Sequence, residues 1–209
     1  MTSRKQTLLS ILEVLSVAFM GVIATVSSWS KWWLVAPALI YAILKYFEYR
    51  SGVHDKHLRV HDQLRVLFDL SRFEPEREVR CTYHVPSFHR SLLQVFHYIP
   101  TEKGGGRRFP QDKGIIGEAF RQKRFLVENF EDDDEYRRQM KLKYNYTADE
   151  VRQRSADRRS YFCYPVMDER HRVLGLIYFD SRMFGTFEHE QPLTNFMVRG
   201  CSTISESLI

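Results

Sequence analysis

Cysteine is scarce in this sequence of 209 residues, with only Cys81, Cys163 and Cys201 spread far apart along the chain. There is no CxxC pair, so the spacing indicates neither a cysteine-based zinc site nor a dithiol redox motif. An odd number of distant cysteines also excludes a simple disulfide framework and suits a reducing cytosol. Each of the three lies among apolar residues, which predicts buried core thiols.

The sequence also lacks a phosphate-binding loop of the GxxxxGK[ST] type. Gly104, Gly105 and Gly106 are consecutive, but no GK[ST] follows and no helix opens directly after them. The net charge is only +5. This charge suits a nucleic acid, an anionic membrane or a phosphate ligand, and does not choose among them. No metal site and no resident cofactor is expected.

Charge is sparse in the first 49 residues, where two apolar runs lie. Residues 7–28 carry Glu13 as their only charged side chain, and the run at 29–49 contains Lys45 near its end. A helix needs about 20 apolar residues to cross a bilayer. We therefore predict a two-helix transmembrane hairpin over residues 1–50, with helices at about 7–28 and 29–49.

The turn of this predicted hairpin contains every tryptophan of the chain: Trp29, Trp32 and Trp33. Lysines and arginines concentrate outside the two ends of the hairpin, which by the positive-inside rule places both termini in the cytoplasm. The indoles then lie at the far membrane interface, and a base-stacking role is disfavoured, so no nucleic-acid partner is expected. The predicted localisation is a bacterial inner membrane. A cleaved signal peptide is the rival interpretation, disfavoured by Glu13 and the second apolar run.

The charged side chains of Glu13 and Lys45 fall inside the predicted spans. Glu13 and Lys45 lie at similar depths from the cytoplasmic ends of their helices, at 1.5 Å per residue. Charges inside a membrane usually pair or face water, which predicts a pair or a polar lining. The alternative is that both side chains reach the nearby interface, and the sequence leaves this open.

Residues 51–72 are polar with apolar residues at helical spacing, among them Val60, Leu64 and Leu67. This pattern predicts a helix that links the membrane segment to the following domain. The domain itself, residues 73–209, begins with two alternating segments at 79–88 and 91–100 that a short connection joins, as in a β-hairpin.

The remainder of this domain contains a short helix, a strand, a second hairpin and a terminal helix. Asp112 is expected to cap the short helix, which carries Ile115 and Ile116. The second hairpin is expected at 161–181. Together these elements predict an α+β domain in which helices flank an antiparallel sheet.

The order of these elements resembles the GAF domain family over residues 55–209. Four stretches carry the resemblance: Gly114–Ala119, similar to the family's GxxGxA turn, Tyr164–Val166, Val173–Ser181, and Phe187 before the last helix. The related PAS fold is the alternative, disfavoured by the terminal helix and the GxxGxA turn. The resemblance implies dimerisation and the sensing of a small molecule between one sheet face and a lid, here residues 128–160.

The lid is rich in charge, and its arginines suit an anionic ligand such as a cyclic nucleotide, although a charge-rich loop can simply be solvated. The family's NKFDE motif is absent, which does not support cyclic GMP. The expected ligand-binding residues are Tyr83, Phe96, Tyr98, Phe130, Tyr136, Arg158, Arg159, Tyr161, Tyr178 and Asp180. The cysteines do not match those of GAF-type methionine sulfoxide reductases, so no enzyme activity and no catalytic residue is expected.

The resemblance leaves two functional interpretations. In the first, a cytosolic sensor binds a small, nucleotide-like signal and acts through its oligomerised transmembrane hairpin, in a layout similar to membrane effectors of bacterial cyclic-nucleotide antiviral systems. In the second, the hairpin only anchors a dimerising module that regulates a separate protein. Either way, the expected partners are the lipid bilayer, further copies of this chain and a small anionic ligand.

Overall fold

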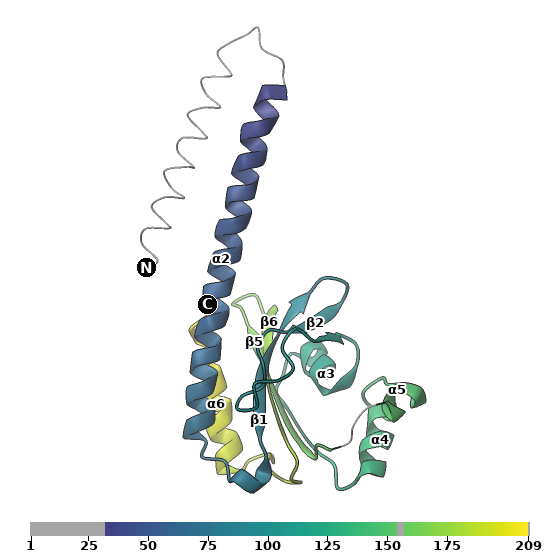
Figure 1. Cartoon of the computed structure of the whole chain (residues 1–209). Helices are drawn as coiled ribbons and strands as arrows, with labels where there is room; N and C mark the ends of the chain where they lie inside the picture. The colour runs from purple at the N-terminus through teal and green to yellow at the C-terminus, as the bar shows by residue number, and fades with distance from the viewer. Residues whose placement is uncertain (1–31, 154–156, 209) are drawn as a thin grey trace. The chain divides into compact units, whose positions relative to one another are not determined.

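The computed structural model describes residues 32–153 and 157–208, and its elements are labelled in Figure 1. The helices are α2 (Trp32–Leu70), the 3-10 helix η1 (Pro75–Arg77), α3 (Gly114–Gln122), α4 (Asp133–Leu142), α5 (Ala148–Arg152) and α6 (Pro192–Glu206). The strands are β1 (Arg80–Ser87), β2 (Ser91–Gln94), β3 (Arg108–Pro110), β4 (Leu126–Asn129), β5 (Ser160–Met167) and β6 (Val173–Ser181).

The chain divides into two compact units, Met1–His57 and Leu58–Ile209. Most of the predicted hairpin, including Glu13 and Trp29, lies outside the described residues, while Trp32 and Trp33 begin α2. Within the part of the chain that the structure describes, no helix combines the length and the hydropathy that a membrane span requires. Lys45 lies in α2 with its Nζ 5.9 Å from the ring centroid of Tyr41, one turn earlier.

Helix α2 is uninterrupted from Trp32 to Leu70. The second apolar run and the polar helix expected at 51–72 are therefore parts of one helix from Trp32 onward. In the second unit, Val60, Leu64 and Leu67 are buried on one side of this helix, as the helical spacing in the sequence predicted.

A six-stranded antiparallel sheet in the order β3-β2-β1-β6-β5-β4 forms the centre of the second unit. The two hairpins predicted from the sequence are confirmed as β1–β2 and β5–β6. They join through β1 and β6, in a register that places Arg80 opposite Asp180 and Tyr83 opposite Ile177. This junction brings residues a hundred positions apart onto the same part of the sheet.

Helices cover both faces of the sheet: α2 and α6 lie on one face, and α3, α4 and α5 on the other (Figure 1). We call these the α2/α6 face and the lid face. Because side chains alternate along a strand, Cys81 and Tyr83 of β1 belong to the hydrophobic cluster of the α2/α6 face, whereas Leu176 and Tyr178 of β6 belong to that of the lid face. The sheet thus separates two cores.

The start of α3 differs from the expectation that Asp112 caps it. The N-cap residue is Lys113, and it makes no side-chain capping bond. The backbone carbonyl of Asp112 instead accepts a hydrogen bond from the Asn145 side chain at 3.0 Å, while the N–H of Gly114 donates to the carbonyl of Tyr144. The loop before α5 therefore holds the first turn of α3, in the role that a capping side chain usually performs.

Candidate ligand-binding cavity

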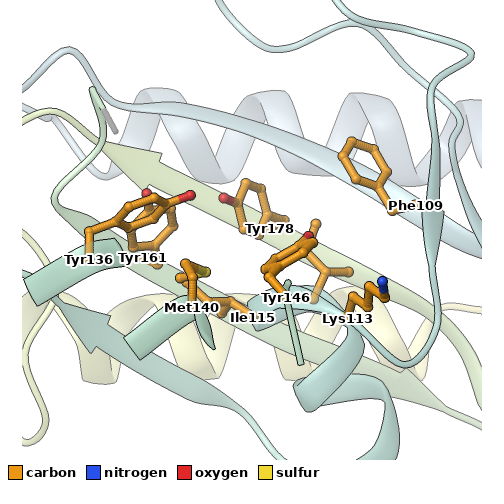
Figure 2. A pocket seen from close by; sticks show the side chains of 10 residues that line it. Phe109, Lys113, Ile115, Tyr136, Met140, Tyr146, Tyr161 and Tyr178 are labelled. Carbon is orange, nitrogen blue, oxygen red and sulfur yellow. The ribbon is translucent and has the colours of Figure 1, made fainter. Parts of the chain in front are cut away.

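A cavity of about 80 Å³ lies on the lid face of the sheet, between the strands and helices α3 and α4 (Figure 2). Its lining combines residues of β3, β5 and β6 with residues of α3 and the lid. The lining residues are Phe109, Lys113, Gly114, Ile115, Ile116, Tyr136, Met140, Tyr146, Tyr161 and Tyr178. The volume is far above the roughly 10–15 Å³ that one water needs, so the cavity has room for a small molecule.

Tyrosines form much of the cavity wall. Tyr161 of β5 stacks on Tyr136 of α4 with ring centroids 6.5 Å apart, and Phe130 packs edge-on against both rings. Burial raises the pKa of Tyr161 and of Tyr178 well above the usual value. Their hydroxyls therefore stay neutral, and the wall combines aromatic surface with groups able to donate or accept hydrogen bonds.

The first turn of α3 forms another part of the wall, and its two glycines have a structural reason. Gly114 has φ +75°, and a Cβ there would lie 2.8 Å from the hydroxyl of Tyr146, which also lines the cavity. A Cβ at Gly117 would lie 2.9 Å from the carbonyl oxygen of Gln111. The GxxGxA turn therefore lets α3 begin directly against the cavity wall and the preceding loop.

Lys113 is the one cationic side chain among the residues that line the cavity, and it precedes the first turn of α3. Its Nζ lies 2.6 Å from Oε1 of Glu150 in α5. The hydrogen bond from Lys113 lowers the pKa of Glu150 to about 2. The cavity wall thus combines the positive end of a helix with a lysine whose present partner is a half-exposed carboxylate.

A histidine is buried behind the aromatic wall. His84 of β1 is fully buried, and its ring lies edge-on to Phe109 and Tyr178, with centroids 5.2 Å and 5.8 Å away. Neither ring nitrogen has a hydrogen-bond partner among the described residues. Burial lowers the pKa of His84 to about 3, so the imidazole is neutral at physiological pH.

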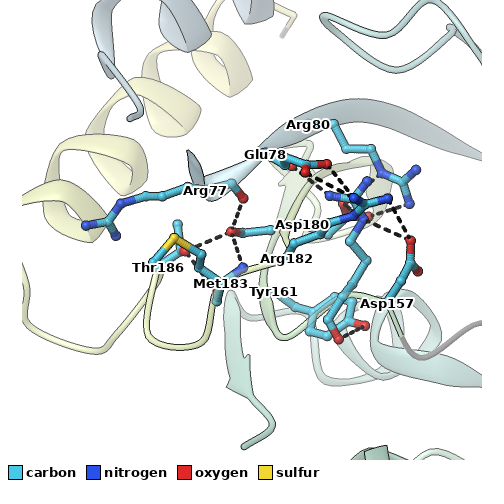
Figure 3. A network of polar contacts seen from close by, with 11 residues as sticks. Arg77, Glu78, Arg80, Asp157, Tyr161, Asp180, Arg182, Met183 and Thr186 are labelled. Carbon is cyan, nitrogen blue, oxygen red and sulfur yellow. Dashed lines mark hydrogen bonds and ion pairs between the residues drawn. The ribbon is translucent and has the colours of Figure 1, made fainter. Parts of the chain in front are cut away.

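A network of charges surrounds Asp180 at one end of the sheet (Figure 3). The Arg80 guanidinium donates two hydrogen bonds to this carboxylate, from Nε to Oδ1 at 2.7 Å and from Nη2 to Oδ2 at 3.1 Å. Arg158 approaches it with Nε 3.4 Å from Oδ1. Burial raises the pKa of Asp180, and Arg80, Arg158 and a hydrogen bond from Tyr178 oppose this rise. The cavity wall and the network therefore meet at Tyr178.

The structure places the predicted ligand-binding residues in four locations. Tyr136, Tyr161 and Tyr178 line the cavity, and Phe130 lies directly behind two of them. The charge network contains Asp180 and Arg158, with Tyr98 beneath the Arg80 guanidinium at 4.1 Å.

Arg159, Tyr83 and Phe96 lie away from the cavity. Arg159 pairs with Asp133 of α4 at 2.6 Å. Tyr83 and Phe96 pack on the α2/α6 face, with stacked rings 6.5 Å apart. The alternation along β1 explains this position of Tyr83, since it must lie opposite to His84 and Thr82.

Several lining residues were not predicted from the sequence: Phe109, Lys113, Ile115, Ile116, Met140 and Tyr146. A partial signal was present, because Lys113 directly precedes the GxxGxA turn and the two isoleucines lie within it. Tyr146 lies beside Gly114, a contact that no spacing along the chain indicates.

Together, the sheet order, the flanking helices and a lid-covered aromatic cavity define a GAF-like α+β domain. Neither protein-family models nor curated protein sequences give a match to this chain. Solved structures, in contrast, do give matches. The GAF domain region of a protein from Geobacter sulfurreducens PCA is 17% identical, covers 75% of this chain and 97% of its own, and has a TM-score of 0.50.

Two further solved structures are similar. The type II free methionine-R-sulfoxide reductase from Thermoplasma acidophilum is 16% identical, covering 73% of this chain and 92% of its own with a TM-score of 0.50. The GAF domain of the Acinetobacter phosphoenolpyruvate-protein phosphotransferase is 13% identical, covering 73% and 93% with a TM-score of 0.46. At identities this low, the two structures with a TM-score of 0.50 establish the fold alone, which is GAF-like.

The cysteines lie in positions unsuited to thiol chemistry. Cys81, Cys163 and Cys201 are all free and buried. Burial raises the pKa of each thiol, which disfavours the reactive thiolate. The sequence had predicted Cys81 and Cys163 as core-facing strand residues, and they are buried in β1 and β5.

Proposed function

We propose that the protein is a sensor that binds a small ligand in the cavity on the lid face. The observation that carries this proposal is the cavity of about 80 Å³, whose lining includes four tyrosines and the first turn of α3. The GAF-like fold supports it, because domains of this fold typically sense small molecules. The buried thiols favour binding over catalysis as the role of the site.

The chemistry of the wall favours a compact ligand with an anionic group. The amides of the first helical turn have no acceptor within their own helix, and the helix dipole favours negative charge at that end. Lys113 lies beside them and can exchange Glu150 for an anion of the ligand. Ligand pockets of drug size are about 300–1,000 Å³, so a nucleotide would require the lid to open.

A matched pair of lysine variants tests this proposal. Lys113→Met removes the cation at the start of α3, and Lys123→Met makes the same change at the exposed C-cap of the same helix. The full chain is assayed for thermal stabilisation by a panel of small carboxylates, phosphates and cyclic nucleotides.

The expected result is stabilisation by at least one anion, lost in Lys113→Met and retained in Lys123→Met. If every panel member fails, or both lysine variants respond alike, the anionic-ligand proposal is refuted.

We further propose that the protein associates with a membrane through residues 7–28 and 29–49, and that its output is a membrane effect produced by oligomers, as in the antiviral effectors of similar layout. The apolar composition of these runs supports this. The competing function is an anchored module that regulates a separate protein. Membrane depolarisation in cells expressing the chain, abolished by Glu13→Leu with Lys45→Leu, supports the first; depolarisation that is absent or indifferent to the pair supports the second.

Self-association is proposed to use the outer surfaces of α2 and α6. Val66 and Leu70 of α2 are 57% and 62% exposed, and Phe196 of the neighbouring α6 is 41% exposed. Apolar side chains gathered on neighbouring helices favour contact with another protein surface. Changing Val66 and Phe196 to lysine is expected to reduce the molecular mass measured by light scattering, whereas Phe88→Lys, at a residue 84% exposed on the β1–β2 turn, is the control. An unchanged mass would refute this interface.

A further inference from the structure

We infer that Arg158 couples the ligand cavity to the segment that follows helix α2, so that the state of the cavity is transmitted to η1 and the end of α2. This inference rests on the proposed ligand-binding role of the cavity. Three links support it. A hydrogen bond joins the cavity wall to Arg158, a second joins Arg158 to Glu78, and several contacts fix η1 to the end of β6.

The first contact links the cavity wall to the backbone of Arg158. Tyr161 lines the cavity, and its hydroxyl donates a buried hydrogen bond to the carbonyl of Arg158 at 3.0 Å. The ring and the hydroxyl of Tyr161 form one rigid group. A ligand that displaces the ring, which also stacks on Tyr136, must therefore stretch or break the bond to Arg158.

The second contact links the side chain of Arg158 to the segment after α2. The guanidinium Nη1 donates to the backbone carbonyl of Glu78 at 2.7 Å, and the side chain is only 9% exposed. Glu78 is the residue that ends η1, in the left-handed conformation with φ 43° and ψ 46°. Such a conformation is strained for a non-glycine residue and persists only when its surroundings hold it. The hydrogen bond from the buried guanidinium to the Glu78 carbonyl is one such restraint.

The third group of contacts fixes η1 to the end of β6 (Figure 3). The carbonyl of Arg77 accepts hydrogen bonds from the N–H of Arg182 at 3.1 Å and from the hydroxyl of Ser181 at 2.6 Å. The side chain of Arg182 pairs with the carboxylate of Glu78 at 3.0 Å. The turn between α2 and β1 therefore depends on β6 and on Arg158, the same elements that meet the cavity wall.

Charge neutralisation alone does not explain the position of Arg158. Arg80 already binds both oxygens of Asp180, whereas the Nε of Arg158 is 3.4 Å from the same carboxylate. The shortest polar contact of the Arg158 side chain is with the carbonyl of Glu78. This guanidinium is therefore placed to hold the η1 segment as well as to balance the buried acid.

Hydrogen exchange on the ligand-free full chain tests the coupling. Tyr161→Phe keeps the ring in the cavity wall and removes only the hydroxyl that binds Arg158. Arg158→Lys keeps the charge beside Asp180 and removes the guanidinium fork. Met140→Leu is the control, because Met140 lines the same cavity and is buried, and a leucine of similar volume is well tolerated.

The expected result is that amides of residues 71–79 exchange about tenfold faster in Tyr161→Phe and in Arg158→Lys, because each loses a buried hydrogen bond. Met140→Leu leaves these rates unchanged. The two changes break the same series of contacts, so their effects should not add. The amides of residues 71–79 in the double variant should exchange less than about twofold faster than in the more affected single variant.

Three results would overturn the inference. The exchange rates of residues 71–79 could be unchanged in Arg158→Lys, or they could rise equally in Tyr161→Phe and Met140→Leu. In the double variant, the rate increase could equal the product of the two single increases. Circular dichroism of each variant establishes that the fold is retained, and global unfolding would appear as faster exchange throughout α6. The measurement needs no ligand, so its failure is distinct from a failure of the anion titration to find one.

Discussion

The two faces of the central sheet bury aromatic residues of different kinds. The α2/α6 face contains the phenylalanines Phe162, Phe179 and Phe187, all fully buried and in mutual contact at centroid distances of 6.0–6.3 Å. The lid face contains six buried tyrosines in its cluster, together with the cavity and the unpaired His84. Strands β5 and β6 contribute to both sets, and the alternation along β6 separates Phe179 from Tyr178.

This difference indicates a division of roles between the faces. A close-packed hydrocarbon core stabilises the fold and tolerates little change in volume. The packing is tight there, since a Cβ at Gly200 of α6 would lie 2.4 Å from the side chain of Leu67. Polar groups and open volume on the lid face contribute less stability, and under the proposed function they would recognise the ligand. The following predictions test that division, from the largest expected effect to the smallest.

The largest loss of stability is expected from Phe179→Ala on the α2/α6 face. Removing a fully buried phenylalanine from a close-packed core costs about 3–5 kcal/mol. Its neighbour on the opposite face provides the comparison: Tyr178→Phe keeps the ring and loses only the hydroxyl that donates to Asp180, at a cost of about 1.5–3 kcal/mol. Urea unfolding of the full chain, followed by circular dichroism, measures both. Equal losses would contradict the division between the faces.

The next largest effect is expected from Arg80→Met in the charge network. The change leaves the buried Asp180 without the guanidinium that binds both of its carboxylate oxygens. Because Arg80 is itself 25% exposed, we expect a loss of about 2–3 kcal/mol in the free energy of unfolding, somewhat below the cost of breaking a fully buried pair. The pKa of Asp180 is already raised in the folded protein, so protonation favours the fold.

The deficit of the Arg80→Met variant should therefore shrink as the pH falls from 7 toward 5, because the protonated fraction of Asp180 increases. Unfolding curves of variant and parent protein at both pH values measure this. A deficit that grows on acidification would show that Arg80 acts through packing instead of charge.

A third prediction concerns the acid sensitivity of the lid face. His84 is neutral in the folded state, with its pKa lowered to about 3, whereas an unfolded histidine has a pKa of about 6.5. The unfolded state then binds more protons between these values, so stability is full above pH 6.5 and falls as the pH decreases. Linkage gives a loss of about 2 kcal/mol at pH 5.

The variant His84→Gln isolates this contribution, because the remaining histidines titrate in both proteins. Chemical unfolding at pH 7.5 and pH 5 should show the parent losing about 2 kcal/mol more than the variant. Equal pH dependence in the two proteins would mean that His84 is solvated or paired when folded.

Much of the domain could be predicted from the sequence because its signals are local. The alternation of apolar residues indicated the β1–β2 and β5–β6 hairpins, and both are present. The GxxGxA turn indicated α3, whose glycines are required by contacts with Tyr146 and Gln111. The capping box of Thr147 and Glu150 at the start of α5 is a local signal of the same kind.

The face to which each aromatic residue points could not be predicted as well. Tyr83, Tyr161 and Tyr178 all lie in strands, but the pairing of β1 with β6 and of β6 with β5 determines which of them share a face. A shift of one residue in that register would reverse the assignment of Tyr83. The contribution of Lys113 depends on where the α5 loop folds back onto α3, which is a contact between distant segments.

The smallest effect on stability is expected at the residue where we expect the largest effect on binding. Lys113 is 24% exposed and its partner Glu150 is 38% exposed, and pairs that solvent screens in this way contribute little to stability. Lys113→Met should therefore unfold at nearly the same urea concentration as the parent, although it removes the cation from the cavity wall. Comparing its unfolding midpoint with that of Phe179→Ala compares the stability that the two residues, one on each face, contribute to the fold. If Lys113→Met were as destabilising as Phe179→Ala, the lid face would act as a structural core, and the proposal that its cavity binds a ligand would be contradicted.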